Sequence, residues 1–226
     1  MKLYILGIGP GDPELITYKA YNLLKEITLI FYPTGGKEAL ALSILEKLLD
    51  LKDKSLIELY FPMKKERDLL EHWKNLSDKI VYHLRETNLG AFITLGDPAF
   101  YSTSYYLKDF LLAQGVEIEV VSGISAFSTA SAKFLCPLTL GDEEVIITVG
   151  ERLVKNQKCY TNLNCIVVFK CHKFMAQIQE FAKKNNFEVF LGNRVSLREE
   201  RLWRNPQELL NDDLDYFTLA ILKRKR

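Results

Sequence analysis

The chain has 226 residues, of which 48% are hydrophobic and 26% are charged, so it is long enough for one large or two modest globular domains with a packed core. Its 30 Lys and Arg residues nearly cancel its 29 Asp and Glu residues, and the net charge of +1 excludes a whole-chain attraction to nucleic acid. No apolar run reaches the roughly 18 residues of a membrane span, and the N-terminal run is too short for a secretory signal.

In the first 135 residues, short apolar runs alternate with helical patterns. Strands are expected at residues 3–8, 28–32, 55–61, 91–95 and 116–121. Helices are expected at residues 17–26, 39–49, 66–86, 102–114 and 126–135. This alternation predicts an α/β architecture with a mostly parallel sheet that is covered on both faces.

The remaining residues show a different pattern, with more strands than helices. Strands are expected at 144–149, 165–169, 187–191 and 215–222, and helices at 173–185 and 206–211. This pattern predicts a second sheet that is partly antiparallel, and the loop at 137–142 is a plausible boundary. The basic tail, residues 223–226, is interpreted as a solvated end.

The four cysteines, at positions 136, 159, 165 and 171, show no Cys-x-x-Cys spacing. Together with the missing export signal, this predicts a cytoplasmic protein with reduced thiols. Cys171 and His172 are neighbours, but adjacent strand residues point to opposite faces and rarely share a metal. We therefore expect no metal site, no nucleic-acid partner and no membrane partner.

The first candidate ligand loop is Gly7-Ile8-Gly9-Pro10-Gly11-Asp12, directly after the first strand. Glycines let a backbone approach a ligand closely. The spacing differs from the dinucleotide fingerprint G-x-G-x-x-G, and Pro10 removes an amide N–H that a pyrophosphate would need. No acidic residue closes the next strand to hold a ribose. These features argue against NAD binding, and a tight turn without a ligand remains an alternative.

Two more loops follow apolar strands. They are the stretch Leu95-Gly96-Asp97-Pro98-Ala99-Phe100-Tyr101-Ser102-Thr103 and the stretch Ser122-Gly123-Ile124-Ser125-Ala126. Each alone is also typical of an ordinary turn, with Ser125 as a helix N-cap. Since ligands of open α/β sheets bind outside the carboxyl ends of the strands, we expect all three loops to converge on one crevice.

These loops resemble those of the tetrapyrrole (corrin/porphyrin) methylase family. The opening pattern of the family is matched by residues 7–17, its central turn by Gly96-Asp97-Pro98, and its third loop, usually Pro-Gly-Ile-Ser, by Ser122-Gly123-Ile124-Ser125. Ser122 replaces the usual proline, a departure that predicts a looser third loop.

Within the family, the resemblance is to the precorrin-2 C20-methyltransferases. It is carried by Phe31-Tyr32-Pro33, by Phe61-Pro62-Met63 before the helix with Trp73, and by the Tyr101-Ser102-Thr103 extension. It implies methylation of carbon 20 of precorrin-2 or cobalt-precorrin-2 in cobalamin biosynthesis. Another methylase of the family, such as one acting on uroporphyrinogen III, or a cofactor-binding homologue without turnover, is the alternative.

The resemblance also implies a homodimer of two-domain α/β chains with a cleft between the domains. A substrate-side domain is expected over residues 1–120 and an adenosyl-side domain over 121–226. The implied cofactor is S-adenosylmethionine, with S-adenosylhomocysteine as product. The residues expected at the cofactor are Pro10, Leu95, Gly96, Asp97, Phe100, Ser102, Thr103, Ser125 and Ala126, and from the second domain Phe169, Lys170, Arg194, Thr218 and Leu219.

Methyl transfer from a sulfonium to an electron-rich macrocycle needs positioning more than a nucleophile. No Ser or Cys stands on a nucleophile elbow, and the three histidines lie in no motif. Asp12, Asp97 and Tyr101 are candidates for a proton acceptor, with none preferred. Lys37, Lys64, Lys65, Arg67 and Arg152 are candidates for binding substrate carboxylates, against the alternative of solvated surface charges.

Overall fold

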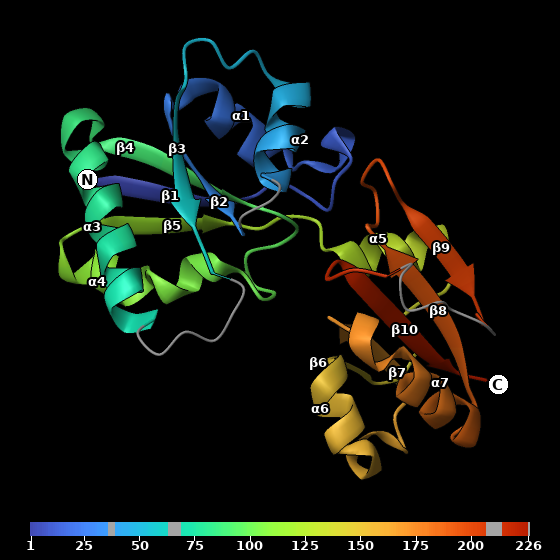
Figure 1. Cartoon of the computed structure of the whole chain (residues 1–226). Helices are drawn as coiled ribbons and strands as arrows, with labels where there is room; N and C mark the ends of the chain where they lie inside the picture. The colour runs from blue at the N-terminus through green and yellow to red at the C-terminus, as the bar shows by residue number, and fades with distance from the viewer. Residues whose placement is uncertain (36–38, 63–68, 207–213, 226) are drawn as a thin grey trace. The chain divides into compact units, whose positions relative to one another are not determined.

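A computed structural model describes residues 1–35, 39–62, 69–206 and 214–225 of the chain. The chain divides into two compact units, Met1–Ser125 and Ala126–Arg226 (Figure 1). Each unit has its own sheet and its own hydrophobic core.

The first unit is built on a five-stranded sheet in the order β3-β2-β4-β1-β5. Every pairing in it is parallel, as the alternating pattern predicted. All five carboxyl ends therefore meet at one edge of the sheet. The strands are β1 (Lys2–Gly7), β2 (Leu29–Thr34), β3 (Ser55–Tyr60), β4 (Leu89–Thr94) and β5 (Glu117–Val121).

Helices cover both faces of this sheet. One face carries α1 (Tyr18–Glu26) and α2 (Leu40–Leu48), and the other carries α3 (Leu69–Thr87) and α4 (Lys108–Ala113) (Figure 1). The α3/α4 face packs the larger core, in which Phe31, Phe92 and Ile80 are almost fully buried. The largely apolar sequences of the central strands β1, β2 and β4 reflect this burial from two sides.

The expected helix over residues 102–114 is in fact two pieces. A 3-10 turn, η2 (Thr103–Tyr106), precedes α4. The Ser102 side chain accepts a hydrogen bond from the Ser104 amide, two residues on, and this tight cap favours a 3-10 turn over an α-helical one. A similar turn, η1 (Pro13–Leu15), precedes α1.

The second unit has a mixed five-stranded sheet in the order β6-β7-β10-β8-β9. Strand β10 is antiparallel to both neighbours, whereas β6 and β7 are parallel, so the prediction of a mixed sheet is confirmed. The strands are β6 (Val145–Val149), β7 (Cys165–Phe169), β8 (Phe187–Asn193), β9 (Arg201–Arg204) and β10 (Thr218–Arg224).

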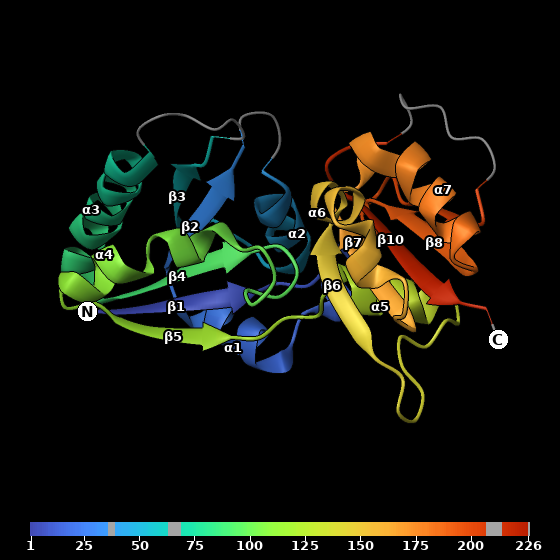
Figure 2. The same ribbon diagram turned by 90° about the horizontal axis from the view of Figure 1, so that it is seen from below.

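Side chains alternate between two cores across this sheet. Ile166 and Val168 of β7 pack beneath α6 (Gly150–Lys155) and α7 (Met175–Lys184). Cys165 and Val167 pack towards α5 (Ala126–Lys133), on the opposite face (Figure 2). Two 3-10 turns, η3 (Gln157–Tyr160) and η4 (His172–Phe174), join these elements.

Two expectations for the second unit need revision, and a third is not tested. Strand β9 and helix α6 were not predicted, because both are short and carry few apolar residues. Strand β10 begins at Thr218 rather than at residue 215, since Asp215 forms a turn in which its carboxylate accepts from the Phe217 amide at 2.9 Å. The helix expected at 206–211 lies, from residue 207 on, outside the described residues.

Candidate functional site

The first and second loops are joined by backbone hydrogen bonds at the carboxyl edge of the first sheet. Gly9 and Gly96 form an isolated antiparallel bridge. The Gly96 amide donates to the Gly9 carbonyl at 2.7 Å, and the Gly9 amide donates to the Gly96 carbonyl at 3.4 Å. Pro10, the next residue along, is buried. The ends of β1 and β4 are therefore tied together beyond the regular ladder.

The third loop packs directly against this bridge. A Cβ atom at Gly123 would lie 2.2 Å from the Gly96 carbonyl oxygen and 2.9 Å from the Gly7 carbonyl carbon. A Cβ atom at Gly7 would lie 2.7 Å from the Gly123 amide nitrogen. Because main chain touches main chain here, only glycine fits at either position. The expected convergence of the three loops is thus found within the first unit.

The Asp97 carboxylate fastens the second loop to the third. Its Oδ1 accepts from the Ala99 amide at 2.7 Å, and its Oδ2 accepts from the Gly123 amide at 3.1 Å. Both oxygens therefore have structural bonds, which argues against Asp97 as the proton acceptor that the sequence left open. Asp12 has a structural bond too, since it caps η1 by accepting from the Glu14 amide at 3.0 Å.

Hydroxyl groups connect the second loop to the sheet below it. The Ser102 hydroxyl lies 3.2 Å from that of Thr94 and 2.7 Å from that of Ser104. Thr94 and Ser104 are buried, so this chain of hydroxyls fixes the loop from beneath. Ser102 caps η2, and Thr103 is the first residue of that turn.

The outer side of the second loop is open. Gly96 has a φ of +73°, and no atom of the described residues lies within 4 Å of the position that its Cβ would occupy. Leu95 and Asp97 on either side are half-buried, and Phe100 is 36% exposed. A ligand can therefore reach the main chain of this loop, the arrangement needed by a cofactor that is held by backbone groups.

The predicted residues of the second unit gather at one end of its own sheet. Phe169, the last residue of β7, pairs with Leu219 of β10, and Thr218 pairs with Asn193 at the end of β8. Lys170 and Arg194 directly follow β7 and β8, and both have left-handed backbones, with φ of +51° and +52°. Ala126, the first residue of α5, packs against the same core cluster as Phe169 and Leu219, and Ser125 before it is the last residue of the first unit.

A polar network that the sequence did not reveal holds this end together. Asp215 accepts hydrogen bonds from Asn193 Nδ2 at 2.7 Å and from Arg194 Nε at 2.6 Å. Asn193 also donates to the Thr218 hydroxyl at 3.0 Å. Burial raises the pKa of Asp215, but the hydrogen bonds from Arg194, Asn193 and the Phe217 amide outweigh it, so the pKa lies below its usual value.

His172 and Ser196 carry the two buried polar atoms without a hydrogen-bond partner among the described residues, namely Nδ1 and Oγ. His172 opens η4, just after β7. Burial, followed by the charge of Lys173, lowers the pKa of His172, so its ring is neutral near pH 7. Cys171 beside it is fully buried, and burial raises the pKa of its thiol to about 12, which makes it an inert packed group.

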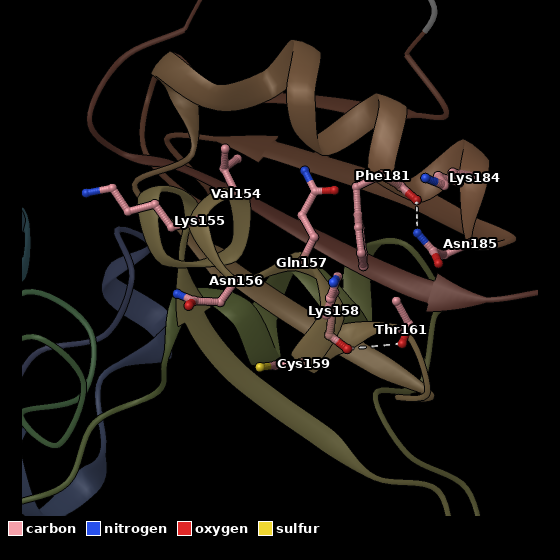
Figure 3. A pocket seen from close by; sticks show the side chains of 10 residues that line it. All are labelled: Val154, Lys155, Asn156, Gln157, Lys158, Cys159, Thr161, Phe181, Lys184 and Asn185. Atoms are coloured by element: carbon pink, nitrogen blue, oxygen red, sulfur yellow. Dashed lines mark hydrogen bonds between the residues drawn. The ribbon is translucent and has the colours of Figure 1, made fainter.

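A hollow of about 520 Å³ lies elsewhere in the second unit, between the end of α6, η3 and the end of α7 (Figure 3). Lys155, Lys158 and Lys184 line it, and Phe181 forms part of its wall. Lys155 pairs with Glu151 at 2.5 Å, and all three lysines are exposed. None of the residues expected at the cofactor lines this hollow, so we assign it to the solvated surface.

The basic residues considered for binding substrate carboxylates come next. Lys37, Lys64, Lys65 and Arg67 lie outside the described residues, and Arg152 is exposed on α6.

Over the described ranges, no group of three or more His, Cys, Asp or Glu side chains could hold a metal ion. No helix in the same ranges is both long and apolar enough to cross a membrane.

Comparisons with known proteins agree with this picture. Residues 2–210 match the model of the family described as Tetrapyrrole (Corrin/Porphyrin) Methylases. The chain is 33% identical over 229 residues to a Methanocaldococcus jannaschii protein named "Probable cobalt-precorrin-2 C(20)-methyltransferase", covering 99% of this chain and 96% of that protein.

Two further likenesses point the same way. A Salmonella typhimurium protein named cobalt-precorrin-2 C(20)-methyltransferase is 26% identical, with 99% of this chain and 97% of that protein covered. The fold is similar to that of a uroporphyrin-III C-methyl transferase from Thermus thermophilus complexed with S-adenyl homocysteine, with a TM-score of 0.69 and 22% identity. That likeness covers 99% of this chain and 97% of the Thermus chain.

Proposed function

The chain belongs to the tetrapyrrole (corrin/porphyrin) methylase family, and from this premise we propose that it transfers a methyl group from S-adenosylmethionine to carbon 20 of cobalt-precorrin-2 or precorrin-2 in cobalamin biosynthesis. Relatives that match it over nearly their whole length carry that name. The proposal also explains the departures from other branches at Pro33 and at Tyr101-Ser102-Thr103.

The observation that carries the proposal is the meeting of three loops at one edge of a parallel sheet. Gly7, Gly96 and Gly123 bring the main chains into contact, and the outer side of Gly96 stays open. Such a site suits a cofactor bound by backbone amides and carbonyls, because glycine carries no side chain that would keep a ligand away from the main chain at Gly96. It does not suit a pyrophosphate, since Pro10 lacks an amide N–H.

Each predicted residue has a proposed place at the cofactor. Leu95, Gly96 and Asp97 meet the amino-acid part through their main chain, and Phe100 packs beside them. Pro10, Ser102, Thr103, Ser125 and Ala126 complete this group. In the second unit, Phe169, Lys170, Arg194, Thr218 and Leu219 lie at one end of the sheet, where they meet the adenine.

The residues present fit a reaction that depends on positioning. S-adenosylmethionine supplies a methyl group bound to a positively charged sulfur, which an electron-rich carbon can attack directly. His72 bonds to the Tyr60 carbonyl at 2.8 Å, and His83 packs against Phe31 with ring centroids 6.3 Å apart, so both rings have structural contacts. The loops therefore contribute by holding the cofactor rigidly, an effect worth up to about 7–11 kcal/mol in favourable cases.

We also propose that the protein is cytoplasmic and forms a homodimer. All four cysteines are free, in keeping with reduced thiols in the cytoplasm. A homodimer is inferred from the resemblance to the family. Sedimentation equilibrium at micromolar concentration should give a mass near twice the chain's 26.1 kDa, and a mass of one chain would contradict the dimer.

Two measurements test the function. Calorimetric titration with S-adenosylhomocysteine should show one saturable site per chain. Anaerobic incubation with methyl-labelled S-adenosylmethionine and precorrin-2, with and without cobalt, should place one label on carbon 20. Label at another carbon would move the chain to a different branch of the family, and cofactor binding without transfer to any tetrapyrrole would leave it a binding homologue.

A further inference from the structure

An aromatic column leads from the core of the first unit to its surface. Phe92 and Phe61 contact each other edge-on at 6.1 Å, and Phe61 packs against Trp73 at 5.4 Å. The Tyr106 ring then stacks on Trp73, with ring centroids 5.2 Å apart and planes 12° from parallel. The exposed fraction is 1% for Phe92, 5% for Phe61 and 8% for Trp73, but 58% for Tyr106.

The column lies at the edge of the sheet that carries the three loops. Phe61 follows the carboxyl end of β3, and Trp73 lies near the start of α3, the helix that leaves this edge. Tyr106 ends η2, the turn that follows the second loop. Because all five strands are parallel, these residues are at the same edge as Gly9 and Gly96.

The geometry of Tyr106 differs from that of an ordinary surface tyrosine. One face of its ring is fixed by the stack on Trp73, which is buried and held in turn by Phe61 and by His72 at 5.1 Å. The ring is nevertheless more than half exposed. A flat aromatic surface held rigid in water loses little entropy when a second planar group stacks on it.

We propose that Tyr106, supported by Trp73, is a stacking platform for the conjugated macrocycle of the methyl acceptor. This inference rests on the proposed function, which supplies a large flat substrate at this edge of the sheet. A nucleic-acid base would also stack on such a ring, but the net charge of +1 offers no general attraction for a polyanionic strand.

The platform can be tested without any substitution. Exposed tyrosines react with tetranitromethane, and mass spectrometry locates each nitrated residue. Cobalt-precorrin-2, added anaerobically at saturating concentration, should slow nitration of Tyr106 at least about fivefold. Tyr82, which is 62% exposed on α3, and Tyr18, which is 80% exposed on α1, should react at unchanged rates. Equal nitration of Tyr106 with and without the macrocycle overturns the platform.

Substitutions provide a second test. Tyr106→Leu should weaken binding of cobalt-precorrin-2 roughly five- to tenfold, whereas Tyr106→Phe, which keeps the ring, should stay within about twofold. The Kd for S-adenosylhomocysteine should not change in either variant. Tyr82→Leu is the matched control and should leave both affinities unchanged. Equal affinity for the macrocycle in Tyr106→Leu and the wild type overturns the proposal.

Failure of the platform and failure of the proposed function give different results. Label transfer to carbon 20 with Tyr106 unprotected, or with Tyr106→Leu fully active at low substrate, removes the platform and leaves the function standing. Absence of any macrocycle binding by the wild-type chain, seen as an unchanged absorption spectrum of the macrocycle, removes both. Since nitration is measured on the unaltered protein, the test does not depend on the folding of a variant.

Discussion

The two groups of predicted cofactor residues are built in opposite ways. In the first unit, three loops touch through their main chains, and the contacts at Gly7 and Gly123 leave no room for a Cβ atom. In the second unit, side chains do the joining, since Asp215 gathers Asn193 and Arg194 and holds the start of β10 against the end of β8. The first group therefore depends mainly on close contacts between main chains, and the second on hydrogen bonds between side chains.

The difference shows how each region should respond to change. A methyl group added at Gly7 or Gly123 would place its carbon 2.2–2.9 Å from main-chain atoms of the neighbouring loop, a clash that rotation of a side chain cannot relieve. A side-chain network can lose one member and keep the others, at the cost of an unpaired buried group. A single substitution in the first region should therefore cause a large loss of stability and cofactor binding. A single substitution in the second region should cause only a partial loss.

The largest effect is expected at Gly123. Gly123→Ala would place a Cβ atom 2.2 Å from the Gly96 carbonyl oxygen, so the second and third loops must separate. We expect a loss of about 3 kcal/mol in the free energy of unfolding, at the upper end of overpacking effects. We also expect loss of measurable S-adenosylhomocysteine binding. Urea denaturation and calorimetry measure the two quantities.

The control for this substitution is Gly115→Ala in the same unit. Gly115 has a φ of +76°, so alanine there is strained, but within the part of the chain that the structure describes no atom lies within 4 Å of its Cβ position. Strain alone should cost about 1–2 kcal/mol and leave cofactor binding intact. If Gly123→Ala were no more harmful than Gly115→Ala, the backbone contact would not be what holds the loops together.

The next effect in size belongs to Asp215. Asp215→Ala removes one acceptor from the buried Asn193 amide, which keeps the Thr218 hydroxyl, and one from the Arg194 guanidinium, which keeps the exposed Glu199. The loss of these two short hydrogen bonds to a carboxylate should cost about 2–3 kcal/mol. Glu199→Ala is the matched control, since Glu199 also binds Arg194, at 3.1 Å, but is 66% exposed. That exposed pair should be worth less than about 1 kcal/mol. Equal losses in the two variants would refute the network.

The contribution of the Asp215 carboxylate to stability should also depend on pH. The pKa of Asp215 is lower in the folded chain than in the unfolded one, so its contribution is present above the unfolded value of about 3.9 and is lost as pH falls through the folded value. Urea unfolding measured between pH 5 and pH 2.5 should therefore show a smaller decline in Asp215→Asn than in the wild type. Parallel declines would contradict the assignment.

A smaller loss of stability is expected at Asp97. Here one side chain joins two loops by accepting hydrogen bonds from their main-chain amides. Asp97→Asn keeps one acceptor oxygen for the Ala99 amide but presents an NH₂ group to the Gly123 amide. We expect a loss of about 1 kcal/mol and a several-fold weaker Kd for S-adenosylhomocysteine. Asp12→Asn should change neither, because Asn caps a turn as well as Asp does.

The contrast also explains what the sequence predicted. Loops that require glycine can be found from the sequence, since Gly7 ends a strand, Gly96 and Gly123 lie just after strands, and a parallel sheet brings the three loops to one edge. The central strands β1, β2 and β4 were predictable because burial from two sides makes them largely apolar.

No pattern in the sequence predicted the hydrogen-bond network around Asp215. Asn193 and Asp215 are 22 residues apart, and their contact depends on β10 entering the sheet between β7 and β8. Neither residue type at that separation points to the other. Likewise, the break between η2 and α4 follows from one serine hydroxyl that caps a 3-10 turn, a choice that helical periodicity does not record.

The smallest expected effect is at Ser122, where the family usually has proline. The Ser122 φ is negative, and no hydrogen bond donated by its amide is found within the described parts of the chain, so a proline ring would cost no bond there. Its carbonyl accepts from the Thr17 hydroxyl at 3.4 Å, a contact that proline would keep. Val121 before it is in a strand, the conformation that a following proline favours.

Ser122→Pro should therefore stabilise the chain by about 0.4–1 kcal/mol, by reducing the freedom of the unfolded state. The Kd for S-adenosylhomocysteine should stay within about twofold, because the contacts of Gly123 and Asp97 already fix the third loop. Thermal unfolding and calorimetry measure both. A large gain in affinity would show that serine leaves the loop loose, and that the backbone contacts are weaker constraints than their distances indicate.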